Sequence, residues 1–127
     1  MSYSEIAFAS ITMTDIVAPG IPSLELLRTD SSSIEANVYL PTADADGGPL
    51  TGMNEMLVVL LEEALEGVNP FDGVAAEEIK AFAEVNGGQF YLEALTEADA
   101  GTMKPAPFAT LIVGKVYWVG VTVKDFS

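Results

Sequence analysis

The sequence predicts a single α+β domain over residues 1–127, with a mainly antiparallel sheet packed against two central helices. Three observations predict this class. The chain has 127 residues, of which half are hydrophobic, so it is long enough to bury one continuous core. Strand patterns occur near both chain ends, and helical patterns occupy the middle. We therefore expect the N- and C-terminal strands to share one sheet.

The first predicted element is an extended strand or arm over residues 1–17. Residues 3–17 are rich in Ile, Phe, Thr and Met, which favours extended backbone. Pro19 and Pro22 follow closely, and two prolines cannot donate to a regular strand ladder. The arm therefore ends near residue 18.

A half-buried strand is predicted over residues 34–40. Ile34, Ala36, Val38 and Leu40 alternate with polar residues and Tyr39, which is the period of a strand with one face on the core. Pro41 ends this strand.

Two helices are predicted in the middle of the chain. The first spans residues 54–66, with Asn54 as its N-cap, Gly67 after its end, and an apolar run at 56–61 that implies burial on all sides. The second is capped by Asp72, and its apolar residues are Ala75, Ala76, Ile79, Phe82 and Ala83. Asn86-Gly87-Gly88 ends it.

The remaining chain predicts further strands. Residues 89–95 favour a strand, and residues 96–101 favour a loop or a short helical turn. Residues 108–126 have the strongest strand signal of the sequence. Gly114-Lys115 predicts a tight hairpin that joins strands at 109–113 and 116–124.

Composition and charge exclude several classes of function. The formal net charge is −14, and this acid excess repels nucleic acids and anionic lipid headgroups. With no His and no Cys, the chain lacks the usual proton shuttle, thiolate nucleophile and soft-metal ligands, so we expect no enzyme activity and no cofactor. The longest apolar run, at 56–61, is too short to cross a bilayer, and no secretory signal peptide is expected.

Carboxylate patterns offer two metal-site hypotheses, and a simpler interpretation is favoured for each. Asp44, Asp46 and Glu55 fall at positions one, three and twelve of an EF-hand loop, but Gly48 and Pro49 occupy positions five and six. An Asp/Gly turn before a helix explains these residues better. The pair Glu62 and Glu66 fits the solvated face of the first predicted helix.

Aromatic residues near the chain ends are the candidate interface residues. Exposed Trp and Tyr are enriched where proteins contact one another. In the last strand, Tyr117 and Trp118 point to opposite faces, so Trp118 lies either under a covering helix or at an interface. The candidates are Tyr3, Phe8, Tyr117, Trp118 and Phe126.

These observations favour a non-enzymatic structural subunit of a large protein assembly. The most specific form of this hypothesis is a viral or phage virion component, such as a capsid decoration protein, whose partners are other copies of the chain or a shell protein. The expected location is then the virion, and otherwise the cytoplasm. One alternative is an acidic inhibitor or immunity-like protein that caps a basic surface or mimics DNA. The other is a small ligand-binding domain or enzyme with a pocket between sheet and helices.

Overall fold

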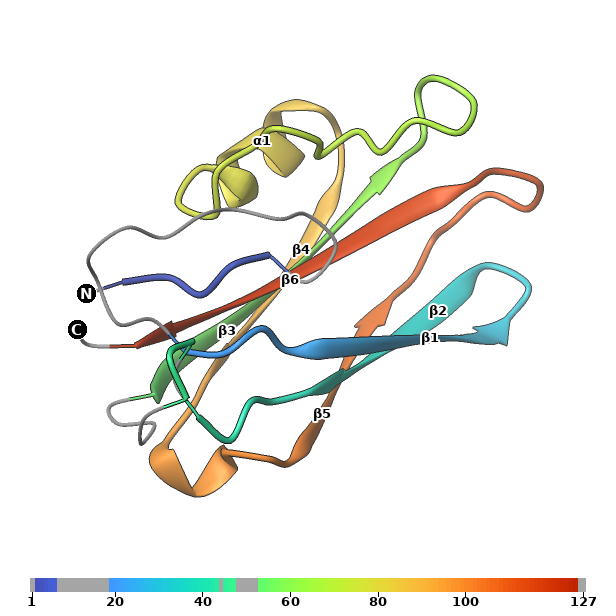
Figure 1. Cartoon of the computed structure of the whole chain (residues 1–127). Helices are drawn as coiled ribbons and strands as arrows, with labels where there is room; N and C mark the ends of the chain where they lie inside the picture. Colours follow the sequence, from blue (N-terminus) through green and yellow to red (C-terminus); the bar gives the residue numbers. More distant parts are fainter. Residues whose placement is uncertain (1, 7–18, 44, 48–52, 126–127) are drawn as a thin grey trace.

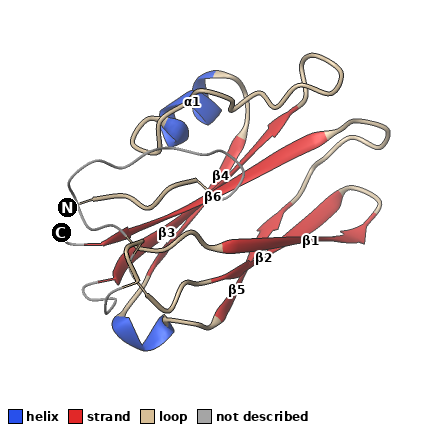
Figure 2. Ribbon diagram, in the orientation of Figure 1, coloured by secondary structure: helices blue, strands red, loops and turns tan. Residues whose placement is uncertain are grey.

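Two antiparallel sheets of three strands each pack face to face in the computed structural model, which describes residues 2–6, 19–43, 45–47 and 53–125 (Figure 1). The strand order is β1-β2-β5 in one sheet and β4-β3-β6 in the other. A short helix covers the outer face of the second sheet, so strands form two layers and the helix lies outside them (Figure 2). The described part of the chain is therefore mostly β.

The elements in chain order are β1 (Ser23–Asp30), β2 (Ser33–Tyr39), β3 (Met53–Glu62), α1 (Ile79–Val85), β4 (Gln89–Ala94), the short 3₁₀ helix η1 (Glu97–Asp99), β5 (Met103–Phe108) and β6 (Tyr117–Asp125).

The predicted helix at residues 54–66 is wrong, because this segment forms β3. The apolar run that implied a buried helix belongs to the central strand of its sheet, between β4 and β6. Its residues alternate between two cores: Met56, Val58 and Leu60 face the other sheet, and the residues between them face α1. A strand buried on both faces has the same continuous apolar pattern as a buried helix.

The α+β fold with two central helices is therefore also wrong. Among the described residues, the second predicted helix survives only as the seven residues of α1. α1 buries Ile79 and Ala83 against Phe71 and Val59 on the outer face of the β4-β3-β6 sheet. The residues before it, from Asp72 to Glu78, form turns instead of helix.

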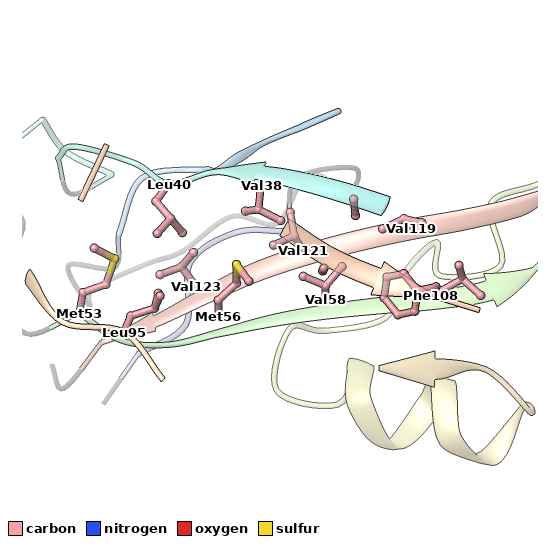
Figure 3. Packing of buried hydrophobic residues seen from close by; sticks show 13 residues of the cluster. Val38, Leu40, Met53, Met56, Val58, Leu95, Phe108, Val119, Val121 and Val123 are labelled. Carbon is pink, nitrogen blue, oxygen red and sulfur yellow. The ribbon is translucent and has the colours of Figure 1, made fainter. Parts of the chain in front are cut away.

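The main core lies between the two sheets, where buried side chains of β2, β3, β5 and β6 interdigitate (Figure 3). Valines dominate the β6 side of this core, and Phe108 closes it from β5. The buried residues of this cluster are Ala36, Val38, Leu40, Met53, Met56, Val58, Leu60, Leu95, Ala106, Phe108, Val119, Val121 and Val123.

The strand predictions at 34–40 and 89–95 are confirmed by β2 and β4, each within one or two residues. The expected helical turn or loop at 96–101 contains η1. In the predicted C-terminal hairpin, β6 forms, but residues 109–116 are a connecting loop rather than a strand. The strand that precedes this loop is β5, which pairs with β2 in the other sheet, whereas β6 pairs with β3.

β5 contains Pro105 and Pro107, and no strand was predicted over residues 102–107. The prolines stand opposite Asn37 and Glu35 of β2, at alternate positions of an edge strand. Their nitrogens therefore both point to the edge that has no partner strand, where a missing N–H group costs nothing. The same prolines prevent another strand from adding to this edge.

The N-terminal residues 2–6 run beside β6. Tyr3 forms an isolated antiparallel bridge with Lys124, and the Ser4 amide donates a 2.7 Å hydrogen bond to the carbonyl of Val123. The rest of the predicted arm, residues 7–17, lies outside the described residues.

Candidate functional site

Three connections meet at one end of the sandwich, opposite the chain termini (Figure 1). We call this region the loop end, and it consists of residues 31–32, 63–69 and 109–116. The Leu111 amide donates to the carbonyl of Ser32, and the Glu63 amide donates to the carbonyl of Val116, both over 2.8 Å. The 109–116 loop is thus attached to both sheets, and its position is fixed by backbone hydrogen bonds.

The loop end exposes large apolar side chains. Ile112, Val113 and Val116 are 59%, 66% and 56% exposed, and Leu65 on the neighbouring loop is 68% exposed. Val68 is also exposed. Single exposed apolar residues are common on protein surfaces, but several on adjacent loops form a patch that is typical of an interaction site.

Three cavities surround this patch. One of about 370 Å³ lies between the end of β3, the Asn86–Gln89 turn and Ile112. A second, of about 250 Å³, continues from it toward Leu65 and Phe82, and the two share Leu61 and Glu62. The third, of about 110 Å³, lies on the β1–β2 side. Tyr117 lines the first and the third cavity, so the hollowed surface runs across the whole loop end.

Thr110 shows backbone strain at the same place. Its φ angle is +62°, and it is the one described residue other than glycine with positive φ. A β-branched side chain rarely adopts this conformation, which costs about 1–2 kcal/mol. Such strain occurs most often at functional sites, and Thr110 lines the largest of the three cavities.

Two of the predicted interface residues, Tyr117 and Trp118, lie at the loop end. The Tyr117 hydroxyl accepts a 2.9 Å hydrogen bond from the Ile112 amide. Trp118 is half-buried on the α1 side of the sheet, and its indole N–H donates to Glu63 Oε2 over 2.7 Å. This bond, with a second one from the Gly67 amide, holds the pKa of Glu63 below its usual value of 4.5.

Tyr3 lies at the other end of β6. The Lys124 Nζ stands 5.0 Å from the centre of the Tyr3 ring, and a hydrogen bond between these side chains raises the pKa of Lys124. Seven residues of β6 separate Lys124 from Tyr117, which is about 24 Å of extended chain. The structure therefore does not bring Tyr3 and Tyr117 into one patch. Phe8 and Phe126 lie outside the described residues.

The terminal end of the sandwich, formed by residues 2–6 and 122–125, buries polar groups that bond to one another. Ser4 Oγ accepts a 2.8 Å bond from the Val123 amide and lies 3.1 Å from Thr122 Oγ1. Ser2 Oγ donates to the buried carboxylate of Asp125 over 3.0 Å. These contacts join the chain ends, so we assign them a structural role.

The outer face of the β1-β2-β5 sheet carries one unsatisfied group. Asn37 is only 6% exposed, and its side-chain oxygen has no hydrogen-bond partner among the described residues. Glu25 and Pro105 stand directly opposite it, and Leu27, Tyr39 and Met103 lie on the same face and are each more than 40% exposed. A donor from outside the chain would satisfy the Asn37 oxygen.

The carboxylate patterns do not form a metal site in the described part of the chain. No three of its Asp and Glu side chains cluster closely enough to hold a metal ion. Glu55 and Glu62 belong to β3, so the helix that both carboxylate hypotheses assumed is absent at these positions. Asp44 lies outside the described residues.

The sequence pattern did not identify Leu65, Ile112, Val113 or Val116 as surface residues. Residues 109–113 had been assigned to a strand, and that assignment implied that half of their side chains were buried. The sequence does contain a signal against that strand: apolar residues around Gly114 do not alternate with polar ones, so they would occupy both faces of a strand.

No helix in the described ranges combines the length and the apolar character that crossing a membrane requires. Comparison with protein families, with curated proteins and with solved structures finds no match for this chain.

Proposed function

We propose that this protein is a non-enzymatic structural subunit of a protein assembly, and that it contacts its neighbour through the loop end. The observation that carries the proposal is the patch of exposed apolar side chains on loops whose backbones are hydrogen-bonded to both sheets. A fixed apolar patch buries its area in an interface with little loss of conformational entropy.

The most specific form of the proposal is a virion component, such as a capsid decoration protein. The sequence supports a structural role because it lacks His and Cys, from which many active sites are built. A small sandwich with one strand edge closed by Pro105 and Pro107 suits a subunit that associates through loops instead of through open strand edges.

An acidic inhibitor is the second candidate, and exposed carboxylates on the α1 side favour it. Asp72, Glu77 and Glu78 are exposed in and beside the turns that precede α1, and they form none of the three ion pairs described. Such a surface would bind a basic partner, and its affinity would fall steeply with salt.

The test is the mass of the purified protein in solution, measured by light scattering at 50 mM and at 1 M NaCl. We expect an oligomer that persists at high salt, because apolar contacts strengthen as salt rises. The double variant Ile112→Ser/Val113→Ser should shift this oligomer to monomer. Ile21→Ser is the matched control, since Ile21 is 53% exposed but lies outside the loop end, before β1.

A monomer at both salt concentrations that also fails to bind an assembled shell protein would contradict the proposal. Capture of a basic partner that 1 M NaCl releases would favour the acidic inhibitor instead.

A further inference from the structure

Three of the five basic residues are engaged inside the chain. Lys80 forms a 2.9 Å ion pair with Glu84 and lies over the ring of Phe90. Lys104 bridges Asp99 and Glu93 at 2.9 and 3.4 Å. Lys124 lies over the ring of Tyr3. Because the chain has nineteen acidic residues, a basic side chain is expected to have a partner within the chain.

The other two basic residues, Arg28 and Lys115, line the same cavity. This is the 110 Å³ cavity of the loop end, between the β1–β2 turn and the 109–116 loop. No described carboxylate forms an ion pair with either residue. No acidic residue is part of the cavity's lining, which includes Ser31, Ser32 and Ser33. The cavity is therefore a basic site on an acidic protein.

Hydrogen bonds to the β1–β2 turn hold the Arg28 side chain in place. Its Nε donates to the carbonyl of Asp30 over 3.1 Å, and its Nη2 donates to the carbonyl of Ser31 over 3.0 Å. These two bonds use two of the five N–H donors of a guanidinium group. The Asp30 carboxylate is engaged within the turn, where it accepts a 2.8 Å bond from the Ser32 amide and a 3.4 Å bond from the Ser32 hydroxyl. Bonds from Ser32 and Ser33 hold the pKa of Asp30 below its usual value.

We infer that this cavity binds a small oxyanion of the phosphate or carboxylate class. A guanidinium and an ammonium are the donors that such anions prefer, and charge-assisted bonds to oxyanions are the strongest of their kind. The volume of about 110 Å³ has room for a single anionic group. This inference goes beyond the proposed assembly function and does not depend on it.

The test is a titration of the ¹⁵N-labelled full chain with sodium phosphate and, separately, with sodium acetate, followed by amide chemical shifts. NaCl keeps the ionic strength constant, because screening alone moves the shifts of exposed charges. We expect saturable shifts confined to residues 31–34 and 111–115, with a dissociation constant on the order of 1 mM.

Arg28→Gln and Lys115→Gln should each raise this dissociation constant at least about fivefold, because each removes one charged donor. Lys80→Gln is the matched control, since Lys80 is already paired with Glu84, and it should leave the constant unchanged. Saturation by phosphate alone would assign a phosphate group to the site, and saturation by both anions would extend it to carboxylates.

Shifts that rise linearly without saturation would overturn the inference, as would equal responses in Arg28→Gln, Lys115→Gln and Lys80→Gln. Either result would mean an adventitious ion only. A protein that is monomeric and fails to bind an assembled shell protein, but nevertheless shows the saturable site, would support this inference while contradicting the assembly function.

Discussion

The two ends of β6 differ in how the chain uses its side chains. At the terminal end, the polar groups of Ser4 and Thr122 are buried and bonded to each other, and Ile6 is 1% exposed. At the loop end, apolar side chains such as Ile112 and Val113 face solvent beside cavities. Polar groups are thus buried at one end and apolar groups are exposed at the other.

This difference implies that the two ends contribute unequally to the stability of the fold. Buried contacts and paired polar groups raise the free energy of unfolding, whereas exposed loops contribute little to it and are free to bind. We therefore expect substitutions of the same type to have large effects on stability at the terminal end and small effects at the loop end.

The largest expected difference comes from one substitution made at both ends. Ile6→Ala should lower the free energy of unfolding by about 3 kcal/mol, because it leaves a cavity in a buried cluster. Ile112→Ala removes an exposed side chain and should change it by less than about 0.5 kcal/mol. Urea unfolding followed by the fluorescence of Trp118 measures both values. Equal losses would contradict the assignment of stability to the terminal end.

A smaller difference is expected for serine hydroxyl groups. Ser4→Ala leaves the buried Val123 amide without its side-chain acceptor and should cost about 2 kcal/mol. Ser31→Ala, in the exposed β1–β2 turn, should cost less than about 0.5 kcal/mol. Thermal unfolding of the two variants compares them directly. A loss of stability in Ser31→Ala as large as that in Ser4→Ala would show that the loop end also contributes to the free energy of unfolding.

The smallest expected effect concerns the bond between Trp118 and Glu63. Because the folded protein lowers the pKa of Glu63, the stabilisation from this bond is present above pH 4.5 and is lost as the pH falls through the lower folded pKa. The single Trp makes this visible: its fluorescence should change with a midpoint below pH 4.5. The change should disappear in Glu63→Gln and persist in Glu62→Gln. A midpoint above 4.5 would show that the bond does not favour the ionised form.

Alternating patterns predicted the strands with one buried face. β2 matches its predicted segment closely, because alternation of period two has one common structural interpretation. β4 matches as well, and its prediction came from Phe90, Tyr91 and Leu92, residue types that favour strands. The position of Trp118 had two predicted outcomes, and the structure places it half-buried on the face that α1 covers. Its neighbour Tyr117 lines cavities, which no local pattern specifies.

The central strand could not be predicted from its own residues. The run 56–61 is apolar at every position because β3 contacts a sheet on one face and α1 on the other, and both contacts are made by distant parts of the chain. The adjacent β-branched residues Val58 and Val59 were the local signal for a strand, and the helical capping pattern at Asn54 and Gly67 outweighed it.

The prolines of β5 misled for a related reason. Proline excludes a strand only where both edges are paired, and whether a strand lies at an edge depends on the whole sheet. The exposed patch at the loop end was missed with it, because residues 109–113 were assigned to a strand that pairs with 116–124, whereas the strand that precedes this loop is β5, at 103–108.

The central place of β3 also has a consequence for synthesis. Val58 pairs with Tyr91 of β4 and with Val121 of β6, which the ribosome adds 33 and 63 positions later. β3 therefore waits about 2–7 s for its first partner strand and about 3–13 s for its second at typical rates of elongation. During that time Met56–Leu61 is an uncovered apolar segment of the kind that pairs with identical segments of other chains. Glu55 precedes this segment and Glu62 and Glu63 follow it, so like charges on both flanks oppose aggregation until β6 arrives.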